Sequence, residues 1–119
     1  MTDPEIRPLR PDDAPQWRRL WTLYLEFYES TVSDEVYSTT FARLAASEHN
    51  DIHGLLATVN GEPRGLVHFL YHGHCWHVEP VCYLQDLYVD TDLRGTGLGR
   101  ALIEAVYAEA DKAGCASVY

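Results

Sequence analysis

Lysine and long apolar segments are the features that this sequence has least of. Lys112 is the only lysine in 119 residues, and the other eight of the nine basic residues are arginines. Lysine-based covalent catalysis therefore has a single candidate, poorly placed near the end of a predicted helix. No run of about 18 apolar residues occurs, so no membrane span is expected.

Cysteine and an N-terminal apolar segment are scarce as well. The three cysteines, Cys75, Cys82 and Cys115, are odd in number and widely spaced, which argues against a disulfide framework. We expect them to be small buried thiols. The first residues, MTDPEIRPLRPDD, lack the apolar core of a signal peptide. These patterns together predict a cytoplasmic protein.

Positive charge is also in short supply. The chain has 18 acidic and 9 basic residues, which gives a formal net charge of −9. This balance disfavours direct nucleic-acid binding, because the phosphate backbone would be repelled. It suits a small cationic substrate, although the same charge serves solubility equally well. The length and the apolar content of 46% predict one domain over residues 1–119.

The N-terminal third is predicted to hold one strand and two helices. A short edge strand is expected at residues 5–10, where proline is tolerated. A helix of about 14–16 residues follows an N-cap at Asp12 or Asp13, and a second helix is expected at residues 34–47. The first helix carries a stripe at helical spacing that we assign to the core: Trp17, Leu20, Trp21, Tyr24, Phe27 and Tyr28.

The remainder is predicted to form a hairpin, a longer strand and a strand–loop–helix–strand unit. Strands at 53–59 and 64–72 flank an Asn-Gly turn signal. The strand at 81–89 is apolar on both faces, so it is expected to be central. After a helix ending near Lys112, residues 115–119 should pair in parallel with residues 83–89. The order β-α-α-β-β-β-α-β predicts an α/β fold with a mixed sheet and helices on its faces.

The segment LRGTGLGRAL, residues 93–102, is a candidate phosphate-binding loop. A nucleoside-triphosphate loop needs a lysine followed by serine or threonine, and here Arg100 is followed by Ala101. A dinucleotide loop needs Gly-x-Gly-x-x-Gly, whereas Gly95, Gly97 and Gly99 are spaced Gly-x-Gly-x-Gly. The pattern that fits is Arg-x-x-Gly-x-Gly, after an apolar strand and before a helix.

With this loop, the segment YLQDLYVDTDLRGTGLGRALIEAVYAEADKAGC, residues 83–115, resembles the GCN5-related N-acetyltransferase (GNAT) superfamily. It is most similar to the histone acetyltransferase-like and the polyamine or amino-acid acetyltransferase branches. The resemblance implies a GNAT-like acyl-CoA N-acyltransferase fold whose last helix and strands are missing from these 119 residues. It implies acetyl transfer from acetyl-CoA to a primary amine of a small molecule or peptide, with no resident metal.

The resemblance also implies how acetyl-CoA is held. Backbone groups of the strand LYV would bind the pantetheine arm, and the loop and the following helix dipole would bind the pyrophosphate. The arginine would add a charged donor, and glycines would let the backbone approach the phosphates. The implied cofactor-binding residues are Leu87, Tyr88, Val89, Arg94, Gly95, Thr96, Gly97, Leu98, Gly99 and Arg100.

Catalytic groups are less completely indicated. The resemblance implies that the backbone N–H of Leu87 binds the acetyl carbonyl, and Asp86 is a candidate base. Polyamine-type relatives carry a glutamate where this chain has Gln85, so Glu79 or a water chain remain alternatives for the base. The family's general acid is commonly a tyrosine on the missing helix, and Tyr119 is not assigned to that role.

The acceptor side and the alternative functions remain open. The segment YHGHCWHVEP, residues 71–80, could ligate a metal, but a polar loop lining the substrate opening is favoured. Acidic residues around the first two helices would suit a protonated amine, or simply form a solvated loop. The alternatives to an enzyme are a non-catalytic acyl-CoA-binding or sensing module, and an interaction domain that dimerises through its unfinished sheet edge.

Overall fold

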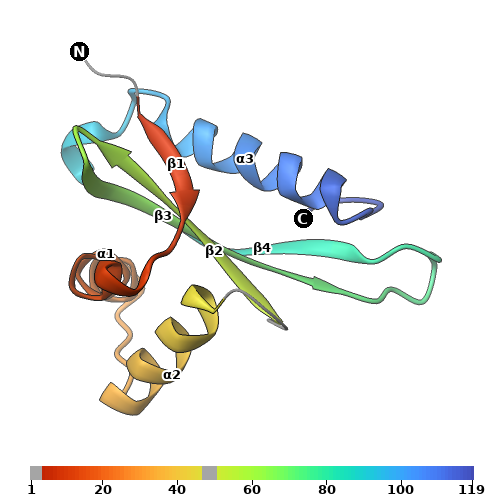
Figure 1. Cartoon of the computed structure of the whole chain (residues 1–119), viewed down its shortest axis with the longest axis horizontal. Coiled ribbons are helices and arrows are strands. Elements are labelled where there is room, and N and C mark those ends of the chain that lie inside the picture. Colours follow the sequence, from red (N-terminus) through yellow and green to blue (C-terminus); the bar gives the residue numbers. More distant parts are fainter. Residues whose placement is uncertain (1–3, 47–50) are drawn as a thin grey trace.

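Helices cover both faces of one sheet in the part of the chain that the computed structural model describes, residues 4–46 and 51–119. Figure 1 shows α3 on one face, α1 and α2 on the other, and a long β3–β4 hairpin extending beyond both layers. The order of elements confirms the predicted one. The elements are β1 (Glu5–Pro8), α1 (Ala14–Phe27), α2 (Asp34–Ala45), β2 (Ile52–Val59), β3 (Glu62–His72), β4 (Val81–Val89) and α3 (Leu98–Lys112), with short 3-10 turns η1 (Pro11–Asp13) and η2 (Thr91–Leu93).

The sheet is antiparallel from β1 to β4, in the order β1-β2-β3-β4. The predicted parallel pair exists, but it lies at the start of β4, where Cys82 bridges Val118. Tyr119 N–H donates to Cys82 O at 2.9 Å, and Leu84 N–H donates to Tyr119 O at 2.8 Å. The prediction of a central strand is therefore right for the first half of β4 only. Among the described residues, the second half has a strand neighbour on the β3 side alone.

A β-bulge lies near the middle of β4. His68 on β3 is opposite Asp86, and the next residue, Phe69, is opposite Leu84, so Gln85 is an extra residue in β4. Such a bulge bends its strand and increases the local twist. The bulge lies between the half of β4 that pairs with residues 117–119 and the half that borders the site described below.

Two apolar clusters pack the faces of the sheet. One joins α3 to the sheet around Leu102 and Val106, which are fully buried, and the other joins α1 and α2 to the opposite face around Trp17 and Leu20. The assignment of the whole α1 stripe to the core is wrong at its end. Phe27, the last residue of α1, and Tyr28, which follows it, are 68% and 60% exposed.

Helix ends and turns follow the sequence signals, except at the start of α1. Asp13 precedes α1 but does not cap it, because its carboxylate accepts hydrogen bonds from Arg7 at 2.8 and 2.9 Å, which lower the pKa of Asp13. Ser33 caps α2 by accepting from Val36 N–H, and the helix ends at Ala45. The predicted end at residue 47 lies outside the described residues. The β2–β3 turn has positive φ at both Asn60 and Gly61, as its Asn-Gly signal predicts.

The cysteines are all free, but they are not all buried. Cys82 is buried and Cys115 is half-buried, whereas Cys75 is exposed at the tip of the β3–β4 hairpin. The expectation of three buried thiols is therefore wrong for Cys75, since the hairpin tip extends away from both helical layers. No helix among the described residues is long and apolar enough to cross a membrane.

Candidate active site

A cleft of about 290 Å³ separates α1 from the second half of β4. We call it the α1–β4 cleft. One wall is the exposed end of α1, and the other is the strand that the sequence assigns to the pantetheine arm. Its lining residues are Tyr24, Phe27, Tyr28, Leu87, Tyr88, Val89 and Arg94. The cleft therefore brings the predicted cofactor strand beside a helix wall that the sequence assigned to the core.

The backbone of β4 turns two residues toward the open side of the strand. Asp90 N–H donates to Arg64 O on the β3 side at 2.9 Å. Because hydrogen-bonding direction alternates along a strand, the N–H and C=O groups of Leu87 and Val89 face away from β3, while those of Tyr88 pair with it. Leu87 and Val89 can thus offer backbone groups to a ligand. Tyr88 contributes its ring, which is buried, instead of its backbone.

The loop after β4 presents unpaired backbone donors at the start of α3. Gly95 and Gly97 have φ of 84° and 91°, a left-handed conformation that glycine adopts without strain. The first helical hydrogen bond runs from Ala101 N–H to Gly97 O at 3.0 Å. The N–H groups of residues 98–100 therefore have no helical acceptor, and they lie at the positive end of the helix dipole. No atom lies within 4 Å of where a Cβ on Gly97 would be, so the loop leaves room for a pyrophosphate.

The side chains of the other predicted loop residues are engaged within the protein. Thr96 uses its N–H and its hydroxyl to donate to Leu93 O, which shapes the loop. The side chain of Leu98 is buried in the α3 cluster, so only its backbone can face a ligand. Arg100 pairs with Glu104 along the exposed face of α3 at 3.0 Å.

Arg94 points along the end of β4 and into the α1–β4 cleft. Its Nε donates to Val89 O at 3.2 Å, and its guanidinium carbon lies 5.6 Å from the centre of the Tyr88 ring. We expected all the N–H groups of Arg94 to be available to the pyrophosphate. In the structure its Nε–H already donates to the backbone of β4, so only the terminal nitrogens remain available. Arg94 also lines the cleft.

Asp86, the candidate base, lies in a buried chain of hydrogen bonds on the α1 face of the sheet. Trp17 Nε1 is 3.0 Å from His68 Nε2, and His68 Nδ1 is 2.8 Å from Asp86 Oδ2. An indole N–H can only donate, so His68 Nε2 accepts and its proton sits on Nδ1, from which it donates to Asp86. The side chain of Asp86 is 12% exposed. The sequence identified Asp86 but missed His68, a polar residue at a strand position that the sheet buries.

Tyr24 lines the α1–β4 cleft on the side of Asp86. Burial, followed by the nearby Asp86 charge, raises the pKa of Tyr24 well above its ordinary value. The hydroxyl therefore stays protonated throughout the neutral range. The helical spacing of Tyr24 does not predict this position, because it depends on how α1 crosses β4.

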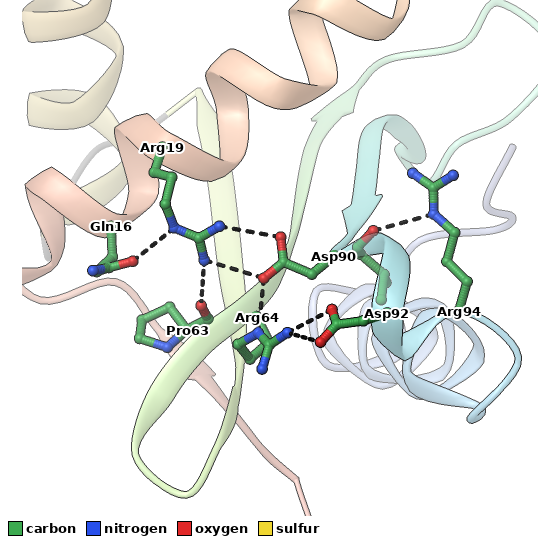
Figure 2. Close-up of polar contacts among 8 residues, drawn as sticks. Gln16, Arg19, Pro63, Arg64, Asp90, Asp92 and Arg94 are labelled. Atoms are coloured by element: carbon green, nitrogen blue, oxygen red, sulfur yellow. Dashed lines mark hydrogen bonds and ion pairs between the residues drawn. The ribbon is translucent and has the colours of Figure 1, made fainter.

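A cluster of two arginines and two aspartates lies where β4 ends, which we call the Arg19–Asp90 cluster. Figure 2 shows Arg19 of α1 and Arg64 of β3 converging on the carboxylate of Asp90. The closest nitrogen–oxygen distances are 3.1 Å for Arg19 and 2.7 Å for Arg64, and Arg64 also binds Asp92 at 2.6 Å. The cluster joins the cleft-lining helix, the β2–β3 hairpin and the start of the pyrophosphate loop.

The other sequence candidates lie away from this cleft or are partly neutralised. His72 Nε2 lies 2.6 Å from the hydroxyl of Tyr119, which stacks on Tyr83. Glu79 is exposed in the loop that joins β3 to β4. Among the described residues, no group of three or more histidine, cysteine or acidic side chains is arranged to hold a metal ion. Of the acidic residues near α1 and α2, Asp34 is paired with Arg18 at 2.6 Å.

The outward-facing backbone of β4, the unpaired N–H groups at the start of α3 and the adjoining cleft form the kind of site that an acyl-CoA-dependent N-acyltransferase needs. The acetyltransferase (GNAT) family profile matches residues 17–119, and the chain belongs to this family. It is 40% identical over 116 residues to the D-amino-acid N-acetyltransferase HPA3 of Saccharomyces cerevisiae, covering 96% of this chain and 71% of that protein. Acetyl transfer from acetyl-CoA to an amine is thus the activity of this chain.

Solved structures share the fold at lower sequence identity. The aminoglycoside acetyltransferase AAC(6')-Iy, in complex with a bisubstrate analogue of CoA, superposes with a TM-score of 0.83 at 18% identity, covering 99% of this chain and 78% of that one. A ribosomal-protein-alanine N-acetyltransferase from Brucella melitensis superposes with a TM-score of 0.81 at 22% identity, covering 98% and 78%. At these identities the likeness shows the fold alone.

Proposed function

We propose that this enzyme acetylates the primary amine of a small amino-acid-like molecule, with D-amino acids as the first class to test. One observation carries the site assignment. The outward-facing backbone of Leu87 and the wall formed by Tyr24 border the same cleft, which Val89 and Arg94 also line. The 40% identity to a D-amino-acid N-acetyltransferase supports the choice of acceptor.

The residues of the cleft have separate tasks in this proposal. The thioester of acetyl-CoA supplies the activated acetyl group. The N–H groups at the start of α3 hold the pyrophosphate, and Leu87 and Val89 hold the pantetheine arm as an added strand would. Leu87 N–H donates to the thioester oxygen, where negative charge develops during attack. Asp86, held by His68, receives the proton that the attacking amine gives up.

The aromatic wall and the charge of the chain fit a small cationic acceptor. Tyr24, Phe27 and Tyr28 line the cleft, and an alkylammonium group is attracted to the faces of such rings. The net charge of −9 raises the local concentration of cations near the protein. An amine must lose a proton before it attacks, so a proton acceptor beside the aromatic wall serves the same substrate.

Release of the CoA thiol, followed with a thiol reagent, tests the function across a panel of amines. The panel holds D- and L-forms of several amino acids, a polyamine, an aminoglycoside and an N-terminal peptide. We expect release with D-amino acids to exceed release with the same L-amino acids. Equal release with both forms would refute the D-amino-acid assignment, while acetyl-CoA binding without release for any amine would indicate an acyl-CoA-binding module.

A further inference from the structure

Asp90 is the residue at which the strand assigned to the pantetheine arm becomes the pyrophosphate loop. It directly follows β4 and precedes η2, and its side chain is 10% exposed. Its N–H donates to Arg64 O at 2.9 Å, which continues the pairing of β4 with β3 by one residue. Its C=O accepts from Leu93 N–H at 2.9 Å, which forms the η2 turn. The backbone of Asp90 therefore sets where the chain leaves the sheet and turns toward α3.

Two arginines from other elements hold the carboxylate of Asp90 (Figure 2). Arg19 of α1 donates to both oxygens, at 3.2 and 3.1 Å, and Arg64 Nε donates to Oδ2 at 2.7 Å. Each arginine is in turn fixed by a further acceptor. Arg19 donates to Pro63 O at 3.1 Å, and Arg64 donates to both oxygens of Asp92 at 2.6 and 2.7 Å. The carboxylate therefore ties the start of the loop to α1, to β3 and, through Arg64, to η2.

Hydrogen bonds within the loop connect Asp90 to the glycines. Leu93, whose N–H binds Asp90 O, has a carbonyl that accepts from the N–H of Thr96 at 3.3 Å and from the Thr96 hydroxyl. Thr96 directly precedes Gly97, whose left-handed φ of 91° places it at the N-cap of α3. The N–H groups of residues 98–100, which have no helical acceptor, follow at once. A shift of Asp90 would therefore move the donors that are assigned to the pyrophosphate.

The charges of the Arg19–Asp90 cluster balance one another. Asp90 and Asp92 contribute two negative charges, and Arg19 and Arg64 contribute two positive charges. An unpaired carboxylate beside a pyrophosphate site would repel the ligand. The arginines cancel this repulsion, and their charge-assisted hydrogen bonds make the carboxylate a firm anchor for the loop.

We propose that Asp90 is a positioning residue for acetyl-CoA binding, which holds the pyrophosphate loop against α1 and β3 through Arg19 and Arg64. In this role the carboxylate does not contact acetyl-CoA. It orients the N–H groups at the start of α3, so its loss should weaken the binding of acetyl-CoA and leave the chemical step unchanged once acetyl-CoA is saturating. The inference rests on the proposed function, in which these N–H groups hold the pyrophosphate.

Asp90→Asn is the test, because positioning and charge predict opposite results for it. The variant leaves one positive charge in excess near an anionic ligand, and by charge alone acetyl-CoA would bind more tightly. An amide has one oxygen in place of two charged ones, so it cannot hold both arginines as the carboxylate does. We expect the dissociation constant for acetyl-CoA, measured by calorimetric titration, to rise roughly tenfold, the lower end of the cost of one lost hydrogen bond to a charged group. The kcat at saturating acetyl-CoA should stay within about twofold of wild type.

Asp13→Asn is the matched control for a merely structural effect. The Asp13 side chain is 8% exposed and accepts from both terminal nitrogens of Arg7, at 2.8 and 2.9 Å, but it lies in η1 and not in the pyrophosphate loop. Both substitutions should lower Tm, since each breaks a buried arginine–carboxylate pair. Only Asp90→Asn should change the binding of acetyl-CoA, and Asp13→Asn should keep the dissociation constant within about twofold of wild type.

Arg64→Lys tests the same anchor without changing the net charge. Arg64 uses Nε for Asp90 and a terminal nitrogen for Asp92, and a lysine ammonium lacks this planar fork. We expect the dissociation constant to rise roughly three- to tenfold, and this variant decides the matter if Asp90→Asn does not fold.

Tighter or unchanged acetyl-CoA binding in Asp90→Asn, equal weakening in Asp90→Asn and Asp13→Asn, or wild-type binding in Arg64→Lys would overturn the proposal while leaving acetyl transfer intact. A wild-type protein that neither binds acetyl-CoA nor releases thiol with any amine would instead overturn the proposed function, and the role of Asp90 with it.

Discussion

Gly97 is the residue of the pyrophosphate loop whose replacement has the most predictable consequence. Its φ of 91° is left-handed, and alanine in that conformation costs roughly 1–2 kcal/mol. No atom lies within 4 Å of the added Cβ, so the cost is backbone strain without a steric clash. For a chain of this size we expect Gly97→Ala to lower Tm by roughly 4–8 °C.

The same substitution should weaken acetyl-CoA binding. The Cβ would project into the open space over the loop, and relaxation of φ would turn the N–H groups at the start of α3 away from the pyrophosphate. Loss of one hydrogen bond to a charged group costs about 1.5–3 kcal/mol. This corresponds to a dissociation constant roughly 10–150 times larger.

Gly99→Ala provides a matched control two residues away. Gly99 has no positive φ, and its added Cβ would meet Val89 Cγ2 at 3.8 Å, an ordinary contact. It is the second residue of α3, where alanine is more favourable than glycine by up to about 1 kcal/mol. We expect unchanged or higher Tm and acetyl-CoA affinity within about threefold of wild type.

Calorimetric titration with acetyl-CoA and thermal unfolding by circular dichroism measure both quantities on the same samples. Three proteins are compared: wild type, Gly97→Ala and Gly99→Ala. If Gly97→Ala binds acetyl-CoA as wild type does, or if both variants weaken binding equally, the loop does not hold the pyrophosphate in the way argued above.

Three further substitutions test other parts of the structure. Arg19→Gln should raise the KM for acetyl-CoA by at most about fivefold, because the half-exposed ion pair with Asp90 contributes about 1 kcal/mol or less. The control, Arg18→Gln on the same helix, should leave this KM unchanged. His53→Gln should reduce the loss of stability that wild type shows below pH 6.5. Burial lowers the pKa of His53, so as the pH falls the unfolded chain binds a proton at this residue before the folded chain does. The difference in Tm between pH 7.5 and pH 5.5 should therefore be smaller in the variant, and an unchanged difference would contradict the prediction. Leu102→Ala should lower the free energy of unfolding by about 2–5 kcal/mol in urea, and a loss below 1 kcal/mol would contradict its buried position in the α3 cluster.

The features that the sequence predicts well are local ones. The Asn60-Gly61 turn, the end of α3 before Gly114 and the loop around Gly97 depend on φ values that few residues other than glycine and asparagine adopt. The conformation at such positions can be predicted from the sequence without knowing which residues pack against them. The order of strands and helices follows in the same way, from hydrophobic periodicity and the turns between elements.

The features that the sequence does not predict depend on contacts between distant segments. The bulge at Gln85 is set by the register of β4 against β3. The position of Tyr24 in the cleft wall depends on where α1 crosses the sheet, and the helical spacing alone predicts only that the stripe packs in the core. Arg19 meets Asp90 across 71 residues of sequence, which no local pattern encodes.

The direct test of the account is whether acetyl groups leave acetyl-CoA for an amine on this protein. Thiol release and acetylated amine, followed together by a thiol reagent and mass spectrometry, should appear in equal amounts and only when an amine is present. Release that is independent of the amine, or tight acetyl-CoA binding with no acetylated product from any amine, would contradict the account.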